Sequence, residues 1–335
     1  MDDPADITLD RIRSRHRELA VSIIRTPSVE LGSSSVKRVL DQAKIYLKLE
    51  AFQLTGTFKA RGALSVAHSI PKEERQNGLT GASAGNHAIA VAWAARQMGV
   101  PAKVVMQSTA NPFRVERARS EGAEVVLADG GQATFAEAER LMHEEGFTFV
   151  HPFEGAGTTL GTAGVGLELM EDVSDLNAIV VAVGGGGLIS GVAAAVKQMN
   201  PRCMVFGVEP ISANAVSRGL AANRPVTIEK PDTIADSLAP PMSLPFSLSL
   251  TARYVDDVVT VSDDDLCAAL VIMQEQALLA VEPAAAAAMA GALGPLRQRL
   301  KGKRVAMIVC GSNIDAASYA KLHKRGHLLM PTLLR

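Results

Sequence analysis

A single lysine, Lys59, stands between a Thr-Gly-Thr turn and an arginine in the stretch QLTGTFKARG, residues 53–62. A lysine amine can form a Schiff base with an aldehyde, and it acts as a base near neutral pH when its pKa is lowered. Such chemistry needs an amine held in a fixed position, and Phe58 would flank it. The alternative is an exposed or ion-paired lysine. Arg61 can be solvated or structural, form an ion pair or bind a carboxylate.

Four consecutive glycines, Gly184 to Gly187, follow an apolar run and precede a helical pattern in VVAVGGGGLISG. Without side chains, their backbone N–H groups can converge on an anion, and the start of a helix adds a favourable dipole. The segment fits neither G-x-G-x-x-G nor G-x-x-x-x-G-K-[ST]. It therefore predicts a phosphate cup that is neither a dinucleotide nor a Walker site; the alternative is a tightly packed turn.

A second run of small residues, in GASAGNHAIAVA, leads into Asn86 and His87 at a predicted helix start. Ser83 can cap this helix, whether or not a ligand also binds there. Free N–H groups at the helix start would also suit a substrate carboxylate. His87 taken alone is more typical of a structural histidine.

Cys310 ends an apolar strand in MIVCGSNID. It is a buried small hydrophobe, a weak hydrogen-bond partner for a ring nitrogen, or a nucleophile whose base no sequence feature marks. A lysine for an aldehyde, a glycine cup for a phosphate and a neutral group for a ring nitrogen together indicate pyridoxal phosphate. The combination is far more specific than any of its parts.

The composition is that of a soluble globular protein, with 335 residues, 47% hydrophobic and 21% charged, and a formal net charge of −1. This length suits two domains that share a cleft. The near-neutral charge argues against nucleic acid or a membrane surface as the main partner. The three cysteines form no CxxC pair, which argues against a disulfide framework and suits a reducing cytoplasm. The charged N-terminus is unlike a signal peptide.

Short β-branched runs alternate with longer alanine-rich stretches, which predicts an α/β fold with mostly parallel, buried strands. In such sheets ligands bind at the carboxyl ends of the strands. The glycines within Ala178–Val196 favour a strand, a loop and a helix over a membrane span. The proline-rich residues 238–250 predict an ordered loop. The strands are expected at 43–50, 102–107, 123–129, 148–153, 178–183, 204–210 and 304–311, and helices at 85–99, 111–122, 134–146 and 189–200.

Nine segments carry a resemblance to a known family, in order and spacing. They are KLEAFQLTGTFKARGA, SAGNHAIAVA, HPFEGAGTTLGTAG, GGGGL, GVEP, TIADSLA, VDDVVTVSDDD, AVEPAAAAA and VCGSNID. The chain resembles the fold-type II pyridoxal-phosphate enzymes, and within them the threonine/serine dehydratases with serine racemase. The resemblance runs from IRTPSVE over almost the whole chain. It implies a two-domain fold like that of the tryptophan synthase β subunit, with twisted, mostly parallel sheets and helices on both faces.

Carried over position by position, the resemblance assigns roles to individual residues. Lys59 matches the Schiff-base lysine, and Phe58 the residue stacked beside the cofactor ring. Asn86 matches the partner of the ring hydroxyl and Cys310 the group beside the pyridine nitrogen. The phosphate loop is Gly184, Gly185, Gly186, Gly187 and Leu188, and the loop for the substrate carboxylate contains Ser83, Ala84, Gly85 and His87.

The implied reaction is the conversion of a threonine- or serine-type amino acid to a 2-oxo acid and ammonia. A neutral Cys310 would not keep the pyridine nitrogen protonated, which favours prompt loss of a β-hydroxyl group. Serine racemase carries a serine where this chain has Ala84, and alanine cannot act as the second acid/base. A dehydratase is therefore favoured over the alternatives of the same fold, a racemase and a β-replacement synthase. A regulatory, ligand-binding homologue is the alternative outside enzymes.

Three segments depart from the family pattern. They are Leu160 to Gly164 in place of Ala-Gly-Gln-Gly-Thr, Ala235 to Ser237 in place of Ala-Asp-Gly, and Val281 to Ala285 in place of Val-Glu-Pro-Ala-Gly. We expect a substrate other than, or in addition to, threonine. Metal-binding relatives place an aspartate where this chain has Ala215, so Glu209 is more typical of a structural hydrogen bond, and no metal is expected.

The resemblance also implies an organisation for the whole molecule. A large domain that binds the cofactor is expected at residues 1–75 and 154–335, and a small mobile domain at 76–153. We expect a cytoplasmic homodimer that acts on a small amino acid.

Overall fold

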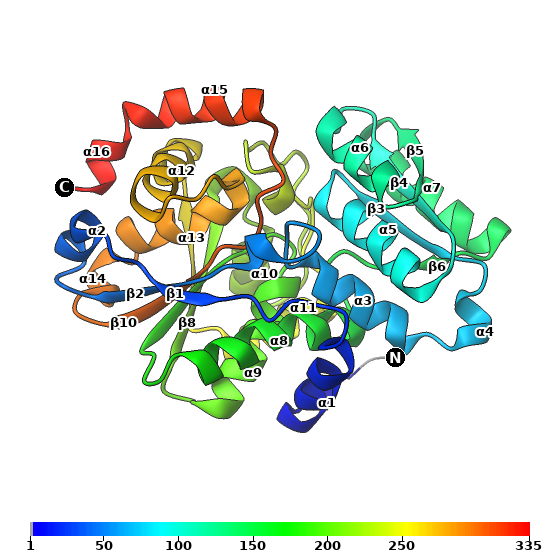
Figure 1. Ribbon diagram of the computed structural model, residues 1–335, viewed down its shortest axis with the longest axis horizontal. Helices are drawn as coiled ribbons and strands as arrows, with labels where there is room; N and C mark the ends of the chain where they lie inside the picture. The colour runs from blue at the N-terminus through cyan, green and yellow to red at the C-terminus, as the bar shows by residue number, and fades with distance from the viewer. Residues whose placement is uncertain (1–2) are drawn as a thin grey trace.

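The larger of two β-sheets has six strands and lies at the centre of the molecule (Figure 1). The computed structural model describes residues 3–335. All neighbouring strands are parallel except the first pair. The β7 strand is buried along its whole length, as expected of an inner parallel strand. In spatial order the strands are β1 (Ser28–Glu30), β2 (Lys44–Lys48), β10 (Arg304–Ile308), β7 (Ala178–Ala182), β8 (Met204–Pro210) and β9 (Asp257–Val261).

Helices cover both faces of this sheet. On one face α13 (Pro283–Leu293) packs on the central strands, and α12 (Asp263–Ala277) covers it (Figure 1). Every residue of α13 is buried, because its sequence PAAAAAMAGAL is small on all sides. A Cβ on Gly291 would lie 2.4 Å from the side chain of Val208. On the other face α8 (Ala156–Asp172) and α9 (Gly187–Met199) pack closely together.

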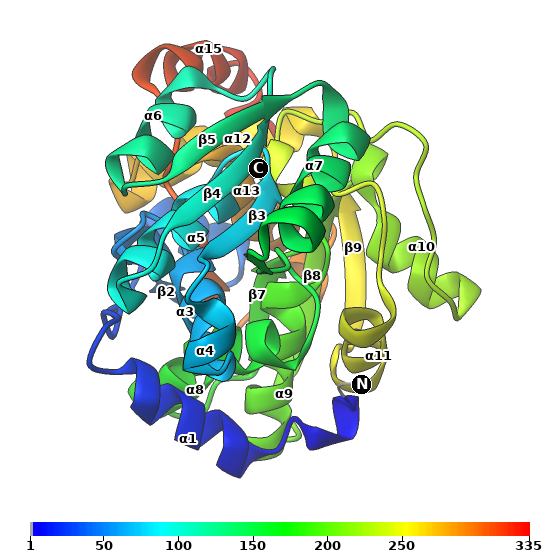
Figure 2. The same ribbon diagram turned by 90° about the vertical axis from the view of Figure 1, so that its right-hand side faces the viewer.

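The smaller sheet has four parallel strands, all between residues 79 and 149. Helices α5 (Asn86–Met98) and α7 (Gly130–Glu145) pack on its opposite faces (Figure 2). Helix α3 (Lys59–Ser69) contacts both α5 and α8, so it joins the two sheets. The boundaries of the two domains stay a prediction. In spatial order the strands are β5 (Glu124–Ala128), β4 (Ala102–Gln107), β3 (Leu79–Ser83) and β6 (Thr148–Phe149).

The remaining helices lie around these layers. Within residues 3–335, none of the helices has the length and apolar character needed to cross a membrane. The remaining helices are α1 (Leu9–Leu19), α2 (Ser34–Val39), α4 (Lys72–Arg75), α6 (Pro112–Ser120), α10 (Ala215–Ala222), α11 (Pro245–Tyr254), α14 (Arg297–Leu300), α15 (Ala316–His327) and α16 (Met330–Leu333).

The predicted α/β class with mostly parallel strands is confirmed. Each predicted strand and helix is present: β4 and β8 have the predicted bounds, and the others have shifted ends. Ala178–Val196 is a strand, a glycine loop and a helix. The expectation of a loop over residues 238–250 is wrong in its second half, where α11 begins at Pro245. A proline at the first helical position lacks only an N–H that would be unpaired anyway. The Glu154 carboxylate accepts the next two N–H groups, from Phe246 and Ser247, at 2.6 and 3.1 Å.

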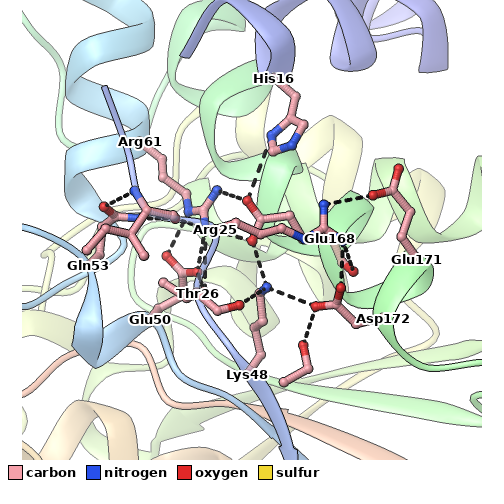
Figure 3. A network of polar contacts seen from close by, with 12 residues as sticks. His16, Arg25, Thr26, Lys48, Glu50, Gln53, Arg61, Glu168, Glu171 and Asp172 are labelled. Atoms are coloured by element: carbon pink, nitrogen blue, oxygen red, sulfur yellow. Dashed lines mark hydrogen bonds and ion pairs between the residues drawn. The ribbon is translucent and has the colours of Figure 1, made fainter. Parts of the chain in front are cut away.

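A buried ion cluster fixes α3 to the large sheet (Figure 3). Arg61 of α3 makes paired hydrogen bonds to both carboxylates, Glu50 at 2.8 and 2.9 Å and Glu168 at 2.7 and 2.9 Å. Lys48 of β2 donates to Glu168 at 2.6 Å. These side chains are 0% exposed. Burial raises the pKa of Glu168, but Arg61 and Lys48 outweigh it and the net pKa is lowered. Of the roles open to Arg61, the structure shows the buried ion pair.

We predict that Arg61→Met lowers the free energy of unfolding by about 3–5 kcal/mol, because it leaves two buried carboxylates short of a cation. Arg25→Met is the matched control. Arg25 pairs with Glu171 and Asp172 at the edge of the same cluster, but its side chain is 48% exposed. Its loss should cost less than about 1 kcal/mol. Urea unfolding of both variants measures the difference, and equal stability would contradict the prediction.

Candidate active site

Lys59 is the first residue of α3, and the turn before it is tied to the end of β10. The Thr57 hydroxyl and the Phe58 N–H both donate to the Cys310 carbonyl at 3.1 Å. Gly56 has a φ of +72°, a conformation that favours glycine, and its carbonyl accepts the Ser312 N–H at 2.9 Å. Lys59 is therefore held at the carboxyl end of the central strands.

The amine of Lys59 lies in a largely enclosed site. Its Nζ donates to the Pro152 carbonyl at 2.5 Å and lies 5.1 Å from the centre of the Phe58 ring. Burial lowers the pKa of this amine to about 8, with smaller opposing effects from Cys310 and Glu282. With this pKa, roughly a fifth of the amine is neutral at pH 7.4, far more than for an ordinary lysine, and the neutral form is the one that acts as a nucleophile or base.

Gly184 to Gly187 connect β7 to the start of α9. A Cβ on Gly185 would lie 2.3 Å from the Phe153 ring, and one on Gly187 would lie 2.6 Å from the Phe153 carbonyl. Gly186 has a φ of +93°. The loop therefore accepts only glycine at these positions. The first-turn N–H groups of a helix have no acceptor within the helix, so the start of α9 suits an anion.

One pocket brings most of the predicted site residues together. Its space, with open solvent at the mouth, is about 440 Å³. Nine of its lining residues were predicted from the sequence: Phe58, Lys59, Asn86, Gly184, Gly185, Gly186, Gly187, Leu188 and Cys310. The others are Phe153, Ala182, Ser237, Leu238, Glu282 and Ala284. A reactive amine, a glycine cup and a neutral thiol thus face one space, which fits pyridoxal phosphate.

Asn86 is fixed by a polar network that sequence reasoning missed. Its Nδ2 donates to both Glu282 carboxylate oxygens at 2.7 and 3.0 Å and to the Ser237 hydroxyl at 3.2 Å. Its Oδ1 accepts from Asn313 at 2.7 Å. Burial raises the pKa of Glu282. The Arg114 guanidinium, 3.5 Å from the Glu282 carboxylate, acts in the opposite direction. The one available signal was a carboxylate directly before an all-apolar helix in AVEPAAAAA.

Cys310 lies at the pocket wall and is 3% exposed. Burial raises the pKa of its thiol well above the usual value, and the nearby Glu282 charge acts in the same direction. The thiol is therefore neutral at physiological pH. Because a nucleophilic cysteine needs its thiolate, this environment disfavours the nucleophile alternative.

The loop before α5 differs from the expectation in one respect. The prediction that Ser83 caps the helix is wrong, because Gly85 occupies the cap position and the Ser83 hydroxyl accepts the Gly85 N–H at 2.9 Å. Ser83 is the last residue of β3, too far upstream to reach the first helical turn. Ser83, Ala84 and Gly85 line neither the main pocket nor the side cavity described next. Their role in binding a carboxylate stays a prediction.

A smaller side cavity shares Phe58 and Lys59 with the main pocket. Its lining includes Lys59, His87, His151, Pro152 and Thr162. His87 is buried and its Nε2 lies 2.7 Å from the Val150 carbonyl. Burial and the Lys59 charge lower its pKa to about 3, so the ring is neutral and Nε2 is assigned as the donor. This hydrogen bond gives His87 a structural partner, and its contact with the substrate carboxylate stays a prediction.

Two of the three departures from the family pattern reach these cavities. Ser237 lines the main pocket, whereas Ala285, the altered residue of the third segment, lines neither cavity. Thr162 lines the side cavity, and its hydroxyl donates to the Gly187 carbonyl at 2.7 Å. Gly161 packs on α3, where a Cβ would lie 2.4 Å from the Arg61 carbonyl. The altered residues therefore shape the surroundings of the amine.

Glu209 has the structural role that its sequence context favours. Its carboxylate accepts the N–H groups of Val216 and Ser217, both at 2.9 Å, at the start of α10. Burial raises its pKa to about 7. Among residues 3–335, no three His, Cys, Asp or Glu side chains are grouped as metal ligands.

Comparisons with known proteins agree with this site. Residues 19–311 match the family described as pyridoxal-phosphate dependent enzyme. Phenylserine dehydratase of Ralstonia pickettii is 48% identical over 83% of this chain and 85% of its own length. L-threonine ammonia-lyase of Thermotoga maritima is 38% identical over 96% of this chain and 79% of its own length. The structure of maize serine racemase superposes with a TM-score of 0.87 at 32% identity, and the match covers 95% of this chain and 98% of that one.

The matched residues include the lysine, the glycine loop and the strand that ends in Cys310, so the family and the pocket coincide. The predicted family and cofactor are confirmed. This chain belongs to the fold-type II pyridoxal-phosphate-dependent enzymes, among the ammonia-lyases and racemases that act on amino acids.

Proposed function

We propose that this protein is an ammonia-lyase that converts a β-hydroxy amino acid to a 2-oxo acid and ammonia. One observation carries the proposal: the Lys59 amine, with its pKa lowered to about 8, shares a pocket with a glycine cup and a neutral thiol. The amine is suited to take a proton from a carbon acid, and the cup is suited to hold a phosphate.

The residues of the pocket have separate roles in this proposal. Gly184 to Leu188 hold the cofactor phosphate at the start of α9, and Phe58 supports the ring. Asn86, oriented by Glu282, faces the ring hydroxyl. Cys310 offers a neutral partner to the ring nitrogen. Pyridoxal phosphate supplies the aldehyde that joins to amines and the ring that accepts electrons from the substrate α-carbon.

Lys59 is the proposed base. Its neutral amine takes the proton from the substrate α-carbon. The loop of Ser83, Ala84, Gly85 and His87 is the proposed contact for the substrate carboxylate. Loss of the β-hydroxyl and hydrolysis of the product then release ammonia.

Ala84 favours elimination over racemisation. A racemase needs an acid/base group on the face of the α-carbon opposite the lysine, and a methyl group cannot exchange a proton. A racemase or β-replacement synthase remains the second candidate, because serine racemases share 33% identity with this chain over 93% of its length.

We propose 3-phenylserine as the favoured substrate. The support is the relative named phenylserine dehydratase at 48% identity, together with the altered residues around the amine. Threonine, serine and 3-hydroxyaspartate are the competing substrates, since relatives include a threonine ammonia-lyase and an L-threo-3-hydroxyaspartate ammonia-lyase.

We also propose that the molecule works as a homodimer in the cytoplasm, with residues 76–153 as a mobile small domain. The support is the family resemblance and the three free, unpaired cysteines.

We predict that the enzyme loaded with cofactor releases ammonia and a 2-oxo acid from 3-phenylserine faster than from threonine, serine or 3-hydroxyaspartate. Lys59→Ala should lower each rate roughly 10³-fold or more. Lys103→Ala is the matched control, because Lys103 is ion-paired with Glu145 on the small sheet and should stay within about twofold of the parent. Coupled assays over the L and D forms of each substrate, threo and erythro where both exist, measure the rates. Exchange of α-hydrogen without ammonia release would favour a racemase.

We predict that pyridoxal phosphate attaches to the cofactor-free protein faster as the pH rises, and that the rate levels off above about pH 8. The neutral amine is the nucleophile, and the pKa of Lys59 is lowered from 10.5 to about 8 by burial. The cofactor absorbance band, followed by stopped flow, measures the rate at each pH. A rate that still rises roughly tenfold per pH unit above pH 9 would indicate an ordinary lysine.

A further inference from the structure

Four aromatic rings form a row from the small sheet to the glycine loop. Phe135 of α7 lies 6.4 Å from Phe149 of β6 and 6.4 Å from His151, measured between ring centres. Phe149 and His151 meet edge to face at 5.8 Å, and His151 and Phe153 meet in the same way at 4.7 Å. We call these four residues the aromatic row.

The aromatic row borders both cavities beside the Lys59 amine. Phe153 is 6% exposed, lines the main pocket and fills the space above Gly185. His151 lines the side cavity together with Lys59. The aromatic row therefore runs from the two cavities beside the Lys59 amine to the small sheet.

His151 contributes an uncharged ring with a fixed orientation. Its Nδ1 accepts the N–H groups of Phe153 and Glu154 at 3.2 and 2.9 Å, which places the ring proton on Nε2. Burial and the Lys59 charge lower its pKa to about 4. The row is thus an uncharged, mostly aromatic wall at physiological pH, with the His151 Nε2–H as its one polar donor.

Three rings of the row are not sealed inside a core. Phe135, Phe149 and His151 are each half-buried, whereas Phe153 is buried. Phe135 and Phe149 pack with one flank on the small core of Ala82, Val105, Ala138 and Leu141. Phe135 and Phe149 therefore pack against His151 from the small-sheet side, and His151 itself lines the side cavity beside Lys59.

We propose that His151, supported from behind by Phe135 and Phe149, forms the subsite for the aryl group of a 3-arylserine. This inference rests on the proposed lyase function. Substituents of the substrate α-carbon lie within a few bonds of the Lys59 amine, and the side cavity with His151 begins at that amine. A phenyl group there gains edge-to-face contacts of about 0.5–1.5 kcal/mol per ring pair beyond burial, whereas the methyl group of threonine cannot.

The test compares ligands that bind the loaded enzyme but have no β-hydroxyl to lose. L-Phenylalanine carries the aryl group, and L-2-aminobutyrate carries a methyl group in its place. Shifts of the cofactor absorbance, with calorimetry as a second readout, give the dissociation constant of each. The parent protein should prefer phenylalanine. A parent with no preference for phenylalanine, or no binding of it, would overturn the subsite.

We predict that Phe135→Leu and Phe149→Leu each reduce the preference for phenylalanine over aminobutyrate roughly two- to tenfold. His151→Asn should do the same, since the amide oxygen can still accept the two N–H groups. Phe147→Leu is the matched control. Phe147 is also half-buried next to β6, but its ring faces Lys103 at 5.7 Å and Gly78, away from both cavities. An unchanged preference in the three row variants, or an equal loss in Phe147→Leu, would refute the proposal.

The binding test separates this proposal from the proposed function. If the row variants lose phenylalanine preference but the parent releases no ammonia from any hydroxy amino acid, the subsite stands and the lyase function fails. If the parent releases ammonia from 3-phenylserine and the row variants keep the preference, the lyase function stands and the subsite fails.

Discussion

The paired hydrogen bonds between Arg61 and two buried carboxylates hold the helix on which the chemistry depends. Both carboxylates accept hydrogen bonds from the guanidinium. Glu50 lies in the segment before α3, and Glu168 lies on α8. Because Lys59 begins the same helix, the position of its amine follows from this anchor. Charges buried in this way are costly to separate, so α3 has little freedom to shift. The lysine thereby keeps its place between two sheets that meet at their carboxyl ends.

Around this anchor the pocket combines neutral groups with a place for negative charge. Burial raises the pKa of Cys310 and of Glu282 and lowers that of Lys59, in each case favouring the uncharged form. The start of α9 is then the strongest remaining attraction for a phosphate. Desolvation thus both prepares the amine and defines where an anion belongs.

Much of the fold followed from local sequence, because β-branched runs such as those of β7 and β8 and alanine-rich helices such as α5 have strong intrinsic preferences. Strand β3 and helix α8, both next to the site, could not be predicted in this way. Strand β3, LTGAS, has little β-branched character, and α8 contains GTTLGTAGVG, a poor helix former. Close packing stabilises α8: a Cβ on Gly166 would lie 2.7 Å from the Val192 carbonyl. Such tertiary effects are not encoded in any short window.

Some residues of the site could likewise be predicted from the sequence, and others could not. Lys59, the glycine loop and Cys310 could be located because each sits in a motif whose residue types suggest a chemistry. The partners of Asn86 could not, since Glu282 and Asn313 come from positions 196 and 227 residues away. The aromatic row was missed for the same reason: Phe135 stands apart from the other three in sequence and joins them only when α7 packs on the small sheet.

The glycine loop and Cys310, proposed to bind the cofactor, and the aromatic rings, proposed to select the substrate, lie on different sides of the cleft. The glycine loop and Cys310 extend from the large sheet, whereas Phe135 and Phe149 belong to the small one. Phe153 touches both parts, since it packs on Gly185 and on His151. Phe135 and Phe149 can therefore be exchanged without touching the glycine loop or Cys310, although Asn86 joins the pocket from the small-sheet side. Such a division lets one scaffold diversify by exchanging a few side chains on one wall of its cleft.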